Sequence, residues 1–126
     1  MAKLVEMDEN LTLKDQMENQ VIGTVIVINK FNMESDEVEQ FLKAWEEDAT
    51  QFKNQTGFIS AQLHKGIGKS TVFINYAVWE SLNHYKNAVD NVIGPDFQSQ
   101  LSKYPKSLVV SPHLFKKVAV PGICAD

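Results

Sequence analysis

Arginine is absent from this sequence of 126 residues, and cysteine occurs once. The single cysteine, Cys124, cannot form an intrachain disulfide, which favours a reducing, cytoplasmic location. The positive charges are lysines scattered along the chain, and the formal net charge is -4. A scattered minority of positive charges does not suit a phosphate backbone, so we expect no nucleic-acid partner.

Long apolar runs are also absent from the sequence. No segment approaches the roughly 20 consecutive apolar residues that a membrane-spanning helix requires. The first residues, MAKLVEMDENL, are too polar and acidic for a signal peptide. We therefore expect a soluble cytoplasmic protein with no membrane partner.

Several motifs of metal and nucleophile chemistry are missing, including CxxC, HExxH and GxSxG. The three histidines, His64, His84 and His113, fall in different predicted elements without the spacing of metal ligands. We predict no metal site. The sequence GIGKS at 66–70 lacks the first glycine of a P-loop and joins two predicted strands, so it is predicted to be a hairpin turn.

The spacing of apolar residues predicts secondary structure from residue 21 onward. Ser35 or Asp36 is expected to cap the first helix, Ser81 caps the second, and Pro112 confines the last strand to an edge or a bulge. In chain order, the pattern predicts a strand at 23–32, a helix within 34–55, strands at 58–65 and 71–80, a helix from 82 to about 93, a helical turn at 96–103 and a strand at 107–118.

The main elements follow the order βαββαβ, which predicts an α+β, ferredoxin-like fold with a four-stranded antiparallel sheet. The strands at 23–32 and 71–80 are apolar on both faces, whereas two helices cover only one face. A second copy of the chain is therefore expected to cover the other face in a homodimer. We assign 21–119 to this domain, 1–20 to an extension that can dock on a partner subunit, and 120–126 to a tail.

The most informative segment runs from Phe73 to Tyr85. At the strand period of two, Phe73, Asn75, Ala77 and Trp79 share one face. A buried carboxamide without a hydrogen-bond partner costs about 1–3 kcal/mol, so Asn75 is predicted to contact a structural partner or a ligand. Asn29 stands in the middle of its strand in the same way, and we place Asn29 and Phe73 among the candidate substrate-binding residues.

Four segments resemble the antibiotic biosynthesis monooxygenase family in the same order along the chain. They are INKF at 28–31, TGFISAQLHK at 56–65, FINYAVWES at 73–81 and SPHLFKK at 111–117. The resemblance spans about 21–118 and implies a dimeric α/β barrel. The family includes cofactor-free oxygenases of polyphenols and quinols, heme-degrading oxygenases and proteins without an established role, so fold alone does not choose a function.

The resemblance to the cofactor-free oxygenases implies a set of catalytic residues. Their Asn-x-x-x-Trp strand motif and the tyrosine that follows match Asn75, Trp79 and Tyr85, and a histidine in the preceding strand matches His64. The pocket arginine of those enzymes has no counterpart here. The expected function is cofactor-independent oxidation of an aromatic quinol or polyphenol by molecular oxygen.

Each candidate has a chemical role in such a reaction. Asn75 donates its amide to the developing oxyanion or to bound oxygen, Tyr85 binds a substrate carbonyl, and Trp79 forms an aromatic wall. His64 accepts the substrate proton, because an unperturbed histidine has a pKa of about 6.5. The competing interpretation makes Trp79 and Tyr85 core residues and His64 a solvent-exposed side chain.

Two other functions stay open. A non-catalytic dimer that binds a small ligand or regulates is one, and the missing arginine favours it. Heme binding and degradation is the other, because Asn29 matches a ligand-binding asparagine of the heme-degrading branch. Ala88 and Leu101 stand where that branch has its tryptophan and its axial histidine, so only His84 and His113 are left as outside candidates for a heme ligand.

Overall fold

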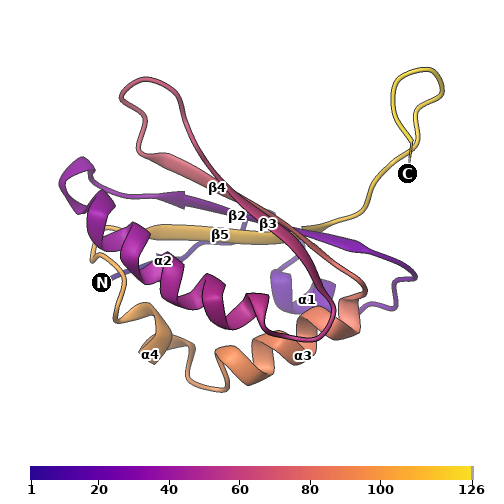
Figure 1. The fold of residues 1–126 in the computed structure, drawn as a ribbon, viewed down its shortest axis with the longest axis horizontal. Helices are drawn as coiled ribbons and strands as arrows, with labels where there is room; N and C mark the ends of the chain where they lie inside the picture. Colours follow the sequence, from indigo (N-terminus) through magenta and orange to yellow (C-terminus); the bar gives the residue numbers. More distant parts are fainter. Residues whose placement is uncertain (126) are drawn as a thin grey trace.

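One mixed sheet forms the centre of the computed structural model, which describes residues 1–125 (Figure 1). The strands stand in the order β1-β5-β2-β4-β3. The central strands β2 and β4 are those whose sequences are apolar on both faces, as buried strands require. The strands are β1 (Lys3–Leu4), β2 (Val25–Asn32), β3 (Phe58–Lys65), β4 (Val72–Trp79) and β5 (Val109–Phe115).

The α+β, ferredoxin-like fold predicted from the sequence is confirmed, with one change in the sheet. The prediction of four antiparallel strands omitted β1, which pairs parallel to β5. Only two residues of β1 form this pairing, so no alternating pattern was present to predict it. Beyond Val110, β5 has no partner strand on that side, and this free edge accommodates Pro112.

Helices pack on one face of the sheet (Figure 1). Ser81 caps α3 as predicted, because its Oγ accepts a hydrogen bond from the His84 N–H at 3.1 Å. The predicted cap at Ser35 or Asp36 is wrong, because Ser35–Glu37 forms a 3₁₀ turn (η1) before α2 begins. The helices are α1 (Leu13–Met17), α2 (Val38–Lys53), α3 (Leu82–Val92) and α4 (Phe97–Leu101).

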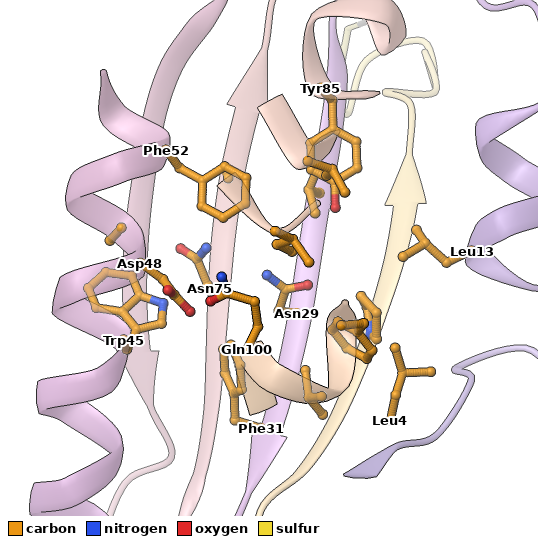
Figure 2. A pocket seen from close by; sticks show the side chains of 18 of the residues that line it. Leu4, Leu13, Asn29, Phe31, Trp45, Asp48, Phe52, Asn75, Tyr85 and Gln100 are labelled. Carbon is orange, nitrogen blue, oxygen red and sulfur yellow. The ribbon is translucent and has the colours of Figure 1, made fainter. Parts of the chain in front are cut away.

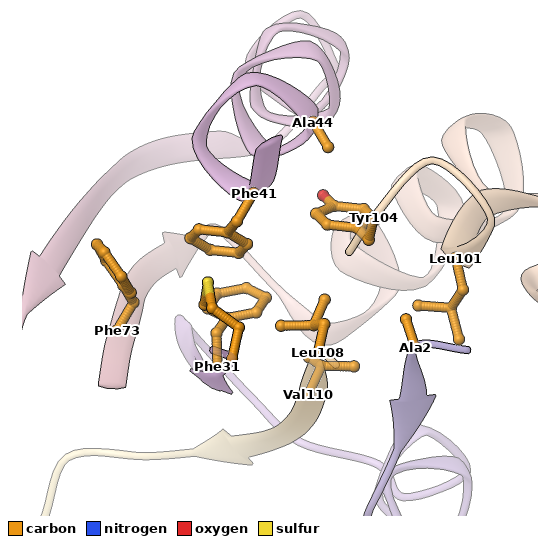
Figure 3. Packing of buried hydrophobic residues seen from close by; sticks show 10 residues of the cluster. Ala2, Phe31, Phe41, Ala44, Phe73, Leu101, Tyr104, Leu108 and Val110 are labelled. Atoms are coloured by element: carbon orange, nitrogen blue, oxygen red, sulfur yellow. The ribbon is translucent and has the colours of Figure 1, made fainter. Parts of the chain in front are cut away.

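Two apolar clusters fill the space between sheet and helices. The first surrounds Phe41 of α2, whose ring centroid lies 4.8 Å from that of Phe31 and 5.1 Å from that of Phe73 (Figure 3). The second surrounds Trp79, which contacts the rings of Phe58 and Tyr85 edge-on. The large aromatic residues therefore hold α2 and α3 on the sheet.

The opposite face of the sheet remains partly open in the single chain. Ile74 and Tyr76 point to this face and are each 39% exposed, while Ile26, on the same face opposite Val78, is buried. The C-terminal segment extends away from the sheet and carries one bridge, between Val120 and Cys124 (Figure 1). Residue 126 of the predicted tail lies outside the described residues. Within residues 1–125, no helix has the length and apolar character needed to cross a membrane.

Candidate functional site

A polar row crosses the helix-facing side of the sheet between the two apolar clusters. Asn29 of β2 lies opposite Asn75 of β4 on one side and opposite Pro112 of β5 on the other. Residues two positions away on each strand belong to one apolar cluster or the other, for example Phe31 and Val27 on β2. The strand period of two thus places two carboxamides in the middle of an apolar surface.

A cavity of about 540 Å³ lies above this row. Its floor is the sheet, and its sides are helices and the N-terminal segment (Figure 2). Most of its lining is aliphatic or aromatic, as is usual for sites that bind small organic ligands. The sheet contributes Val27, Asn29, Phe31, Asn75, Ala77, Trp79 and Pro112 to the lining, and the helices contribute Trp45, Asp48, Phe52, Tyr85 and Gln100.

Asn75 is the least satisfied polar residue of this cavity. Its side chain is 9% exposed, and its Oδ1 atom is buried without a hydrogen-bond partner. Asn29 points into the same space from the neighbouring strand (Figure 2). A buried acceptor left unpaired costs about 1–3 kcal/mol, which is the energetic signature of a site that a ligand completes.

Trp79 and Tyr85 form the aromatic end of the cavity. Their ring centroids lie 5.8 Å apart in an edge-on arrangement, and both residues line the cavity. Trp79 also contacts Phe52 and Phe58, so it is at the same time a core residue. The hydroxyl of Tyr85 makes no hydrogen bond to residues 1–125, which leaves it free for a ligand.

The helix side of the cavity carries a carboxylate that sequence reasoning missed. Asp48 accepts a hydrogen bond from the Tyr104 hydroxyl at 2.6 Å and forms an ion pair with Lys103. Its position between Trp45 and Phe52 at helical spacing was the available signal, because those two aromatic residues lie on the apolar side of α2 and line the cavity.

Burial raises the pKa of Tyr85, and burial together with the Asp48 carboxylate raises that of Tyr104. The folded state then holds both phenolic protons more tightly than the unfolded state does. The resulting stability is present below the usual tyrosine pKa of about 10 and is lost as the pH rises above it. Neither hydroxyl therefore supplies a tyrosinate base at neutral pH.

We expect these two tyrosines to ionise only when the chain unfolds in alkali. Absorbance at 295 nm, followed with circular dichroism during a pH titration, measures both events in one sample. A Tyr85→Phe/Tyr104→Phe double variant should lose the part of the absorbance change that coincides with unfolding. Ionisation of either residue near pH 10 in a chain with native circular dichroism would contradict this prediction.

Two predicted site residues lie away from the cavity. His64 pairs in register with Ile74, so its side chain is exposed on the opposite face of the sheet and cannot reach Asn75. The reason is strand parity, because His64 and Leu63 point to opposite sides and Leu63 faces the helices. Phe73 is buried against Phe41 in the first apolar cluster and does not line the cavity.

The remaining histidines do not reach the cavity either. His84 lies at the start of α3, where its Nδ1 atom is 2.7 Å from the Oγ of Ser81 and its ring packs against Gly57. Gly57 has a φ of +92°, and a Cβ there would lie 2.3 Å from that ring, so both features require glycine. His113 lies beside Gln16 at the edge of β5. The cavity lining, all within residues 1–125, contains neither histidine nor cysteine, so a heme in it would have neither of these axial ligands.

The helix-covered cavity of this ferredoxin-like fold, polar at one row and aromatic at one end, is a candidate small-molecule site. Residues 24–98 match the antibiotic biosynthesis monooxygenase family, and the chain belongs to that family. This confirms the resemblance found in the sequence. Residues 1–23 precede the matched region.

Two solved structures share this fold. SnoaB, a cofactor-independent oxygenase from Streptomyces nogalater, aligns with a TM-score of 0.65 and 20% identity, covering 80% of this chain and 99% of SnoaB. A predicted monooxygenase from Shewanella loihica aligns with a TM-score of 0.65 and 26% identity, covering 79% of this chain and all of that one. Comparison with curated proteins gives no significant match.

Proposed function

We propose that this protein is a cofactor-independent monooxygenase that oxidises an aromatic quinol or polyphenol with molecular oxygen. The observation that supports it most is the unpartnered Asn75 Oδ1 on the floor of an apolar, aromatic cavity. An aromatic ring fits the walls, and a phenolic hydroxyl supplies the hydrogen bond that Asn75 lacks. Similarity to SnoaB in fold agrees with this proposal.

The reaction must draw its electrons from the substrate. Loss of the phenolic proton gives an electron-rich anion, which transfers electrons to oxygen. A phenol with a free ring position then becomes a quinone, with one oxygen atom entering the ring and the other leaving as water. The phenol supplies all four electrons, so the protein contributes positioning, proton transfer and charge stabilisation.

Four residues carry these tasks in the proposal. The Asn75 amide stabilises the oxyanion, and the Tyr85 hydroxyl, which remains protonated, donates to a substrate carbonyl. His64 lies on the wrong face for proton transfer, so we assign the proton acceptor to Asp48, the carboxylate in the α2 wall. Within residues 1–125, the lining holds one positively charged side chain, that of Lys14, and we assign charge stabilisation to it.

Oxygen uptake by metal-stripped protein across a panel of quinols and polyphenols tests this function. The proposal predicts one oxygen molecule consumed per phenol, no oxygen returned on addition of catalase, and one labelled atom in the product from ¹⁸O₂. A His64→Ala variant should match the wild type, because His64 is outside the cavity. Uptake that releases hydrogen peroxide would contradict monooxygenation, because simple autoxidation of a quinol gives peroxide.

The second candidate is a non-catalytic dimer that binds the same class of ligand. The observation that favours it is the lack of a histidine among the residues of the lining. Saturable binding of 1-naphthol without oxygen uptake from any quinol would support this candidate. We place either function in the cytoplasm, in agreement with the single, exposed Cys124.

We also propose that two copies pack through the open face of the sheet, around Ile74 and Tyr76. Light scattering at micromolar concentration should give twice the chain mass of 14.2 kDa. An Ile74→Glu variant should shift the protein toward monomer, because it buries a charge in that interface. Ile67→Glu is the matched control, because Ile67 is 96% exposed at the β3–β4 turn. A wild-type monomer would contradict the dimer.

A further inference from the structure

Residues 2–17, which we call the N-terminal strap, close the side of the cavity beside β5. Ala2 is buried in the first apolar cluster. The strap then pairs with β5, since the Lys3 N–H donates to the Leu108 carbonyl at 3.0 Å and the Val5 N–H donates to the Val110 carbonyl at 2.9 Å. The first residues of the predicted extension, 1–20, are thus attached to the sheet of their own chain.

At the far end of the strap, the side chain of Gln16 makes the hydrogen bonds to β5. The Gln16 amide binds both backbone groups of Leu114, accepting from its N–H and donating to its carbonyl, each at 2.9 Å. Gln16 Nε2 also lies 3.1 Å from the Nε2 atom of His113. Gln16 therefore makes the two hydrogen bonds that a neighbouring strand would make, on the part of β5 that β1 does not reach.

Hydrogen bonds within the strap fix the orientation of α1. Thr12 and Asp15 form a capping box, and the Glu6 carboxylate accepts a hydrogen bond from the Leu13 N–H at 2.8 Å. This arrangement directs Leu13 and Met17 into the cavity, with Leu4 beside them, as Figure 2 shows for Leu4 and Leu13. The strap thus supplies a wall beside the polar floor that is apolar at Leu4, Leu13 and Met17 and charged at Glu6 and Lys14.

We propose that the N-terminal strap is the wall that selects the ligand, with Leu13 and Met17 as the residues that determine its size. This inference rests on the proposed binding of an aromatic hydroxyl compound at Asn29 and Asn75. A ligand that places its hydroxyl on this polar row directs an edge of its ring system toward the strap. The strap precedes the family region, which begins at residue 24.

The test compares phenols of two sizes by isothermal titration calorimetry under argon, where no turnover occurs. The probes are 1-naphthol, with two rings, and 9-phenanthrol, with three. A Leu13→Phe variant should weaken 9-phenanthrol binding about tenfold and 1-naphthol binding much less, because the added volume in the wall leaves less room for a third ring. Leu11→Phe is the matched control, since Leu11 belongs to the strap, is exposed and does not line the cavity.

A second variant covers the case in which Leu13→Phe does not fold. Met17→Ala enlarges the same wall and should move the affinity ratio toward 9-phenanthrol. The same ratio of 9-phenanthrol affinity to 1-naphthol affinity in the wild type, the Leu13→Phe variant and the Met17→Ala variant would overturn the strap proposal. An Asn75→Leu variant that weakens both phenols equally would still support the polar floor in that case. Binding of neither probe to the wild type would contradict both proposals, whereas binding without oxygen uptake contradicts catalysis alone.

Discussion

An Asn75→Leu variant is expected to lose about a hundredfold or more of its oxygen uptake while becoming more stable. Removing one donor that stabilises a developing oxyanion typically costs a factor of 10² to 10³ in rate. Leucine has the same number and branching of side-chain heavy atoms as asparagine, and it removes an acceptor that is buried without a partner. The free energy of unfolding should therefore rise by about 1 kcal/mol.

Urea denaturation and initial rates of oxygen uptake, measured on the same preparations, test the predicted gain in stability and the predicted loss of activity together. Asn87→Leu is the control, because Asn87 is exposed on α3. The control should keep its activity. A variant at Asn75 that loses both activity and stability would show that asparagine there is structural, and this outcome would contradict a site completed by ligand.

A Phe41→Ala variant is expected to lose about 3–5 kcal/mol of unfolding free energy. Phe41 is 0% exposed, and its ring lies against those of Phe31, Phe73 and Tyr104. It is the main apolar contact between α2 and the sheet in the first cluster. A domain of this size has a total stability of about 5–15 kcal/mol, so the variant should be close to unfolding.

The adjacent Leu42 provides a sharp control for this prediction. Leu42 is on the same helix and 40% exposed, so Leu42→Ala should cost less than about 1 kcal/mol. Urea midpoints for the two variants make the comparison. Because Phe31 and Tyr104 also line the cavity, Phe41→Ala should weaken binding of 1-naphthol as well. Equal urea midpoints for the two variants would contradict the assignment of the first cluster as the core.

The fold was predictable because its strands and helices carry strong local patterns. The alternation from Phe73 to Trp79 placed Asn75 on the same face as Trp79, and the structure confirms that arrangement. The strap was not predictable, because β1 is two residues long and α1 is five. Elements that short depend on tertiary contacts, such as those of Gln16, which no local pattern reveals.

The site was predicted in part for the same physical reason. Asn29, Asn75, Trp79 and Tyr85 meet in one cavity because strand parity and the start of α3 direct them there. His64 was placed by analogy, and strand parity directs it to the opposite face. Alternation along β3 shows only that Leu63 and His64 point to opposite faces. To exclude His64 from the face of Asn75, one must also know that Leu63 pairs with Asn75 in the β3–β4 hairpin, and the sequence does not give that register.

Binding of an aromatic hydroxyl compound on the row of Asn29 and Asn75 can be tested directly at the side-chain amides of these two residues. Side-chain amide signals of ¹⁵N-labelled protein, titrated with 1-naphthol under argon, report each asparagine separately. We predict saturable shifts of the Asn29 and Asn75 signals at one ligand per chain, with the signal of exposed Asn54 unchanged. Shifts confined to surface amides, with Asn29 and Asn75 unmoved at saturation, would contradict the account.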